Sequence, residues 1–88
     1  MKVYELLNKP EKWTTGTSMR DKDGIPVISE RAAYSYCLVG AIGVCYPSEL
    51  YTHIQKKLSE ELKHRNISQW NDESTYEEVI SVCRKLDI

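Results

Sequence analysis

The chain has 88 residues, of which 41% are hydrophobic and 28% charged, which is the composition of one folded domain (residues 1–88) with too little apolar surface for two cores. The 12 basic and 13 acidic residues nearly cancel to a net charge of −1, which argues against a general attraction to nucleic acid or to an anionic membrane. The longest apolar run, residues 36–46, is far shorter than the roughly 20 residues that span a bilayer.

The three cysteines, Cys37, Cys45 and Cys83, all lie in apolar runs. Their number is odd and none forms a C-x-x-C pair, so the sequence predicts neither a disulfide framework nor a zinc site. The first residues lack the long apolar segment of a signal peptide. We therefore expect a cytoplasmic protein with free thiols, without a membrane span, a metal or a cofactor.

The N-terminal residues predict a short helix. Val3, Leu6 and Leu7 supply its apolar face, and Pro10 would end it because the residue before a proline disfavours helical backbone.

A β-hairpin is expected next. The segment is rich in Thr, Val and Ile, and Asp23-Gly24 is a turn signal between two extended arms. We predict that residues 14–20 pair with residues 25–28, with Pro26 at an edge where a missing N–H is tolerated.

The segment ERAAYSYCLVGAIGVCY is apolar nearly all round, which predicts a buried central helix over residues 32–46. Small residues recur along it at helical spacing, which favours the close approach of another element: Ala33, Cys37, Gly40, Ala41 and Val44. Gly40 and Gly43 match no complete phosphate or dinucleotide fingerprint, so they predict no cofactor.

A further helix should follow Pro47, with Ser48 as its cap. Its apolar stripe repeats every four residues: Leu50, Ile54, Leu58 and Leu62. Its basic flank is interleaved with Glu60 and Glu61 and is typical of a solvated face: Lys56, Lys57, Lys63, His64 and Arg65.

The last helix is predicted over residues 75–86, from the apolar repeat Val79, Val82, Cys83 and Leu86. Thr75 and Glu78 have the spacing of a capping box. The fold class expected is α+β and mainly helical: a short N-terminal helix, a β-hairpin, then three helices, of which the helix over residues 32–46 is central and buried.

The polar side chains are compatible with two hypotheses about function. Cys37, His53 and either Asn71 or Asp72 are the residue types of a small cysteine-dependent hydrolase or transferase. Against it, Cys37 is expected inside an apolar helix and not at a helix N-terminus, where the pKa of a thiol falls.

The other reading is a binding surface around the two tryptophans. Each tryptophan stands at an element boundary beside polar residues, and tryptophan and arginine are common interface anchors. Capping of the last helix does not account for the residues before Ser74. The predicted binding residues are Trp13, Arg20, Trp70, Asn71 and Asp72, the last two in an exposed loop.

Nearly the whole chain resembles a family of small bacterial and phage proteins known only as a domain of unknown function. The motifs that carry the resemblance are W…D-x-x-G, C-x-x-G-A, and W-N-D followed by T-x-x-E-V, here Trp13, Asp21 to Gly24, Cys37 to Ala41, and Trp70 to Val79. The segment between the second and third motifs is short here for that pattern.

We expect a non-enzymatic protein-binding module. The resemblance implies a phage or bacterial origin and so an inhibitor or modulator of a host or defence protein. The partner is expected to be a protein, either a host protein or a second copy of this chain in a homodimer.

Overall fold

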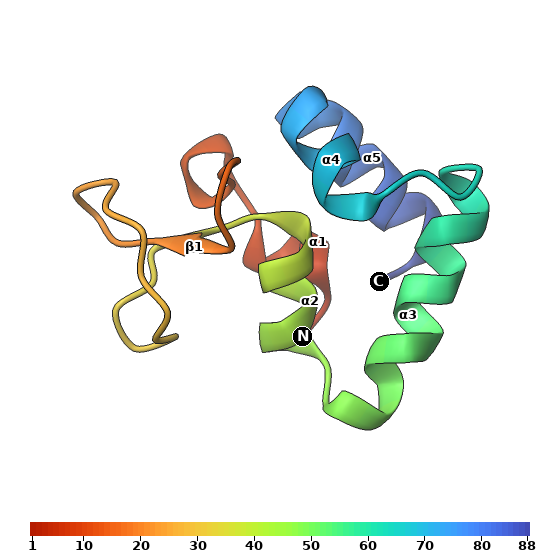
Figure 1. Ribbon diagram of the computed structural model, residues 1–88, viewed down its shortest axis with the longest axis horizontal. Coiled ribbons are helices and arrows are strands. Elements are labelled where there is room, and N and C mark those ends of the chain that lie inside the picture. The colour runs from red at the N-terminus through yellow and green to blue at the C-terminus, as the bar shows by residue number, and fades with distance from the viewer.

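The computed structural model describes all residues, 1–88, as an α+β domain that is mainly helical. The elements are α1 (Val3–Leu6), the short 3-10 helix η1 (Pro10–Lys12), β1 (Met19–Arg20), β2 (Ser35–Tyr36), α2 (Leu38–Cys45), α3 (Ser48–Glu61), α4 (Ile67–Glu73) and α5 (Tyr76–Leu86). The helices form the body of the molecule, and the loop that connects β1 to β2 projects from one side of it (Figure 1). None of the helices has the length and apolarity needed to cross a membrane.

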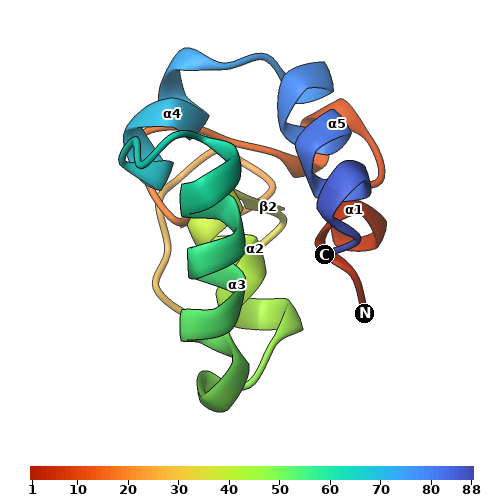
Figure 2. The same cartoon turned by 90° about the vertical axis from the view of Figure 1, so that its right-hand side faces the viewer.

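α2 is the central helix, as predicted, because α1, α3, α4 and β2 all contact it. Figure 2 shows α3 lying along α2, with α1 and α5 together on the other side. Leu38, Ala41 and Ile42 are its buried residues, and they face side chains such as Leu58 of α3 and Val79 of α5 in one core. The two chain ends meet beside this core, where the Val3 N–H donates to the Ile88 carbonyl (2.8 Å).

The predicted extent of the central helix is wrong, because α2 begins at Leu38 and not near residue 32. Ser35 and Tyr36 form β2, and Cys37 is the N-cap, with its Sγ accepting from the Gly40 N–H (3.4 Å). An uninterrupted apolar run signals burial but does not separate a buried strand from a buried helix, which is why the pattern misplaced the boundary.

An antiparallel pair of strands is present, as expected, but the predicted partner of the first strand is wrong. β1 pairs with β2, Met19 opposite Tyr36 and Arg20 opposite Ser35, instead of with residues 25–28. The expected arm forms a single bridge, Arg20 opposite Pro26, flanked by two hydrogen bonds: Asp21 N–H to the Ile25 carbonyl (2.9 Å) and Val27 N–H to the Met19 carbonyl (3.1 Å). Pro26 has no N–H to donate, which limits this arm, whereas β2 is buried on both of its residues.

α3 follows the predicted stripe except at its start. Ile54, Leu58 and Leu62 are buried, but Leu50 is 45% exposed because the first turn extends beyond the core. Ser48 is the first helical residue and not the cap, since Pro47 occupies that position without a side-chain hydrogen bond.

In the last third of the chain, one predicted feature is confirmed and one helix was not predicted. The capping box of α5 is confirmed, with Thr75 Oγ1 accepting from the Glu78 N–H (3.2 Å) and Glu78 Oε1 from the Thr75 N–H (2.9 Å). α4 was missed, although Asn66 caps it by accepting from the Gln69 N–H (2.9 Å). An Asn followed three residues later by Gln is a helix-start signal that could have predicted α4.

Gly40 shows why α2 needs a glycine at one position. A Cβ atom built there would lie 2.4 Å from the Ser18 carbonyl oxygen, which is rigid backbone, whereas a Cβ at Gly43 would meet nothing within 4 Å. The chain before β1 therefore lies directly against the first turn of α2. Of Gly40 and Gly43, only Gly40 confirms the predicted close approach of another part of the chain.

These two glycines give a matched pair of substitutions. Gly40→Ala should lower the free energy of unfolding by about 1–3 kcal/mol, because the methyl group displaces the Ser18 backbone. Gly43→Ala should raise it by about 0.5–1 kcal/mol, because alanine is the better helix former at an unobstructed site. Urea unfolding measures both. An unchanged or higher midpoint for Gly40→Ala would contradict the close approach.

Candidate functional site

Asn71 is a fully buried polar residue on α4, and its side-chain amide joins three parts of the chain. Its Oδ1 accepts from the Trp13 indole Nε1–H (2.7 Å) and from the Leu38 N–H at the start of α2 (3.0 Å). Its Nδ2 donates to the Thr14 carbonyl (3.2 Å) and to Asp72 Oδ1 (3.1 Å). Every donor and acceptor of the amide is therefore used inside the protein.

The neighbours of Asn71 extend this network. Asp72 is exposed, but its Oδ1 also accepts from the Gly16 N–H (3.1 Å), which fixes the loop after Trp13. The Trp13 ring lies against Tyr76 with ring centroids 6.5 Å apart. The Tyr76 hydroxyl donates to the Leu7 carbonyl (2.6 Å). Trp13 is thus held on both its polar and its apolar side.

Arg20 fastens the base of the projecting loop. Its Nε donates to Thr14 Oγ1 (2.9 Å), its Nη1 to the Gly24 carbonyl (3.0 Å) and its Nη2 to the Thr15 carbonyl (3.0 Å). All three nitrogen atoms of the guanidinium therefore hold backbone or hydroxyl groups of this chain. The planar fork of arginine suits such multiple attachment.

Four of the five predicted binding residues therefore meet around Thr14: Trp13, Arg20, Asn71 and Asp72. The expectation that Asn71 and Asp72 lie in an exposed loop is wrong, because both belong to α4; Asn71 is buried and only Asp72 is exposed. Trp70 lies apart from this network and is half-buried, at a shallow hollow with Glu77, Glu78, Ser81 and Val82. The role of the five residues in binding stays a prediction.

The thiol of Cys37 borders a small hollow of about 170 Å³ between α2, α4 and the loop before β1. Asp72 and Ser68 also line it, but His53 does not, since His53 is exposed on α3. Asn71 uses both sides of its amide elsewhere. Cys37 does lie at a helix start, contrary to expectation, but the structure does not bring the predicted Cys-His pair together.

The other two thiols are part of the packing. Burial raises the pKa of the Cys83 thiol to about 12, and burial likewise raises the pKa of Cys45. The thiolate is the reactive form of cysteine, so both side chains are poor nucleophiles at neutral pH.

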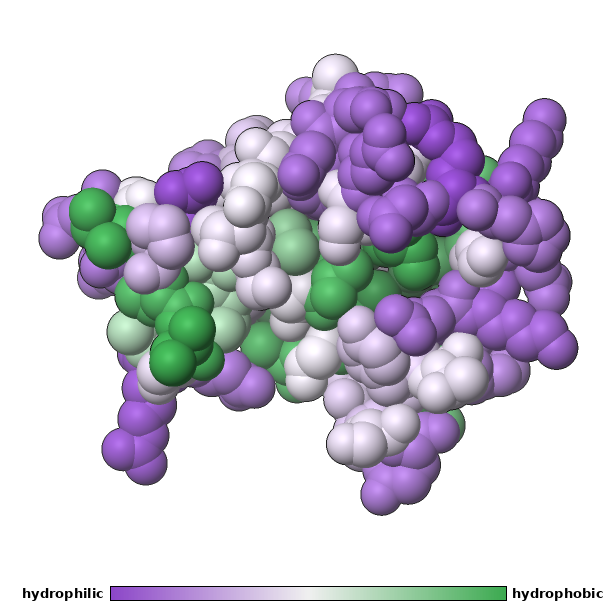
Figure 3. Space-filling view, viewed as in Figure 1, coloured by the Kyte–Doolittle hydropathy of each residue, from purple (hydrophilic) through white to green (hydrophobic).

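Exposed isoleucines mark the projecting loop, which sequence reasoning had assigned to a hairpin arm. Ile28 is 100% exposed and Ile25 57% exposed. Figure 3 shows hydrophobic surface gathered at the end of the molecule where this loop lies. Val27, Ile28 and Ala32 border a hollow there of about 420 Å³. Four apolar residues directly after a turn signal, Ile25 to Ile28, were the sequence signal for it.

A second surface lies where α3 ends. Lys63 and His64 both have left-handed backbone, with φ of 56° and 64°. The Lys63 N–H donates to the Glu60 carbonyl (3.3 Å) and the His64 N–H to the Ser59 carbonyl (2.7 Å), which is a Schellman motif. That motif requires left-handed backbone at residue 63 only. The same conformation at His64, which the motif does not require, costs of order 1–3 kcal/mol.

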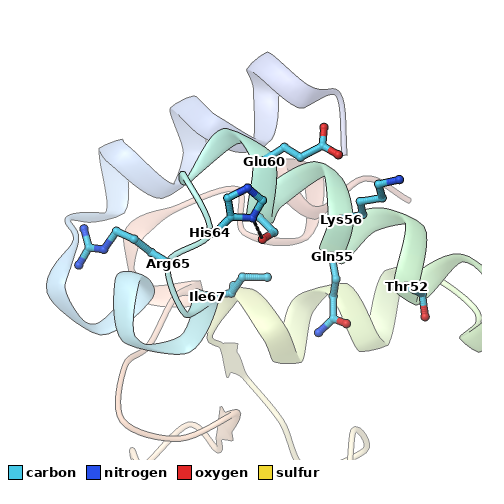
Figure 4. A pocket seen from close by; sticks show the side chains of 8 residues that line it. Thr52, Gln55, Lys56, Glu60, His64, Arg65 and Ile67 are labelled. Carbon is cyan, nitrogen blue, oxygen red and sulfur yellow. Dashed lines mark hydrogen bonds between the residues drawn. The ribbon is translucent and has the colours of Figure 1, made fainter.

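The His64 ring is held against α3, with its Nδ1 3.2 Å from Ser59 Oγ (Figure 4). Around it lies the largest hollow of the surface, about 560 Å³, whose lining is polar apart from Ile67. Lys56 and Arg65 lie on opposite sides of the ring in this view.

The Asn71 network generates a prediction of stability. Asn71→Ala should cost at least about 2 kcal/mol, because the Trp13 and Leu38 N–H groups both lose their acceptor in a buried site. Asp72→Ala, at an exposed position, should cost only about 0.5–1.5 kcal/mol. Denaturant unfolding compares the two variants. Equal, small losses would show that the amide is not a structural centre.

Thiol labelling of the native protein tests the cysteines. With Cys37 and Cys83 buried, an aromatic disulfide reagent at pH 7 should modify Cys45 slowly and the other two only after unfolding. Denatured protein should yield all three thiols as the control. Rapid native labelling that disappears in Cys37→Ser would revive the cysteine-enzyme hypothesis.

Comparison with known proteins gives one match, to a protein family. A model described as "Family of unknown function (DUF6197)" matches residues 2–86, nearly the entire chain. No curated protein and no solved structure matches. The match agrees with the uncharacterised family indicated by the sequence motifs, and the chain belongs to DUF6197, a family of unknown function.

Proposed function

We propose that the chain is a non-enzymatic protein-binding module whose binding element is the projecting loop, residues 21–34. The observation that carries the proposal is the exposure of Ile25 and Ile28, at 57% and 100%, within this one loop. Large apolar side chains gathered on an otherwise polar surface are typical of protein interaction sites.

The attachment of the loop supports the same proposal. The Arg20 guanidinium ties the Gly24 carbonyl to Thr14 and Thr15, and the Asn71 network fixes Thr14 in turn. A loop that is ordered before binding loses less conformational entropy on association, so its apolar contacts contribute more to affinity. On this proposal Trp13, Arg20, Asn71 and Asp72 act by positioning the loop, and Trp70 is a separate contact at the surface.

The charges of the loop indicate the class of partner. Lys22 and Arg31 are outnumbered by Asp21, Asp23 and Glu30, so the loop offers no positive surface for nucleic acid. An apolar pocket with a mixed polar rim, as found on proteins, is its complement. The proposed partner is a host or defence protein that the module inhibits or modulates, with a phage as the source, or else a second copy of the chain.

The three free cysteines support a reducing compartment, and we propose the cytoplasm. The alternative enzyme, with Cys37, His53 and Asn71 or Asp72, has less support, since His53 does not line the hollow at Cys37.

Substitutions in the loop test the proposal directly. In a pull-down from the native host, Ile28→Asp or Ile25→Asp should weaken capture of the partner at least about tenfold, because a charge replaces an apolar anchor. Leu50→Asp is the matched control, since Leu50 is also an exposed apolar residue, at 45%, but lies on α3. Cys37→Ala and His53→Ala should leave capture unchanged.

Size-exclusion chromatography of the same variants identifies self-association, and circular dichroism confirms that each is folded. A dimer that Ile28→Asp converts to monomer would make the partner a second copy. Capture that survives both loop substitutions, or that folded Cys37→Ala abolishes, would refute the loop as the binding element.

A further inference from the structure

The hollow at the end of α3 contains a set of side chains that no part of the binding proposal uses. Its volume of about 560 Å³ lies within the range of sites for small molecules. It is on a different element from the loop of residues 21–34. We propose that it binds a small phosphorylated molecule, with the phosphate group held by Lys56 and His64.

Lys56 supplies the positive charge. Its ammonium group forms no salt bridge, since the three ion pairs of the protein join Lys2 to Asp87, Arg65 to Glu73 and Lys85 to Glu61. A free ammonium at the edge of a hollow can donate charge-assisted hydrogen bonds to phosphate oxygens. Arg65, at the other side, holds Glu73 from the exposed surface and is a weaker contributor.

His64 supplies a directed donor. When the Ser59 hydroxyl donates to Nδ1, the ring proton is on Nε2, and that N–H is free to bond an oxyanion. The left-handed backbone of His64 is not needed to end α3, and the ring lies back against Ser59 in the last helical turns. Strain of this kind is found where a functional group has to be held in one place.

The rest of the lining fits an organic body on the phosphate. Ile67 is its one hydrophobic residue, and Figure 4 shows it beside the His64 ring and Gln55. A phosphate ion alone would fill only a small part of the hollow. Glu60 also lines the hollow and opposes an anion, and Glu73 already neutralises Arg65, so the attraction for the phosphate has to come from Lys56 and the His64 N–H.

Nuclear magnetic resonance titration of the full-length protein tests the proposal, with inorganic phosphate, adenosine 5′-monophosphate and adenosine as probes. Phosphate and the nucleotide should give saturable amide shifts at Lys56, Ser59 and His64, with the nucleotide also shifting Ile67. Adenosine without the phosphate should give none. Equal binding of adenosine and the nucleotide would overturn the proposal, as would shifts that rise linearly without saturation.

Variants separate this site from general charge. Lys56→Gln and His64→Asn should weaken nucleotide binding about threefold to tenfold, the loss expected for one charged or directed hydrogen bond. Asparagine adopts left-handed backbone readily, so His64→Asn should stay folded. Lys63→Gln removes the same charge from a neighbour that does not line the hollow, and should change binding less than about twofold. Glu60→Gln should strengthen binding. Equal losses for Lys56→Gln and Lys63→Gln would refute the site.

Discussion

The fold depends on one buried amide. Two N–H groups from distant segments, the Trp13 indole and the Leu38 backbone, donate to the amide oxygen of Asn71. The amide nitrogen of Asn71 donates to the Thr14 carbonyl and to the Asp72 carboxylate. A side chain there has to accept two hydrogen bonds and donate two in a small volume. A carboxylate cannot donate, an ammonium cannot accept, and an aliphatic side chain can do neither. Asparagine meets the requirement, and no buried side-chain polar atom of the protein is left without a partner.

That requirement links the helical body to the projecting loop. The Leu38 N–H is one of the first donors of α2, so the amide of α4 caps the central helix from outside while Cys37 caps it from within. Gly40 then allows the Ser18 backbone to lie against the same turn. The entry of α2, the Trp13 loop and α4 consequently form one unit, and Arg20 extends that unit to the loop of residues 21–34. A polar network of this kind is rigid only when every member is present.

This arrangement explains which parts of the structure could be predicted from the sequence and which could not. The capping box at Thr75 and Glu78, the buried stripe of α3 and the central position of α2 could be predicted, because each depends on residues within one or two helical turns. The start of α2 could not, because a cysteine is not a preferred N-cap and its external cap comes from a residue 33 positions away. The strand register depends equally on distant partners. Asn71 and Asp72 were singled out correctly as residues that helix capping does not explain, but only the fold shows that their partners are internal.

The distribution of exposed and strained groups gives the protein two separate surfaces. Apolar exposure is concentrated at the loop of residues 21–34, held by hydrogen bonds from Arg20, whereas left-handed backbone is concentrated at Lys63 and His64 at the end of α3. In a domain of this size the free energy of unfolding is small, so a cost of order 1–3 kcal/mol at His64 is a large fraction of it, whereas exposed isoleucines lower solubility instead of stability. Neither feature is required by the core. α3 could end with one left-handed residue, and the loop could carry polar side chains at positions 25 and 28, without any change in the packing of α2. Features that lower stability or solubility and that the fold does not need are the ones for which a role outside the fold has to be sought.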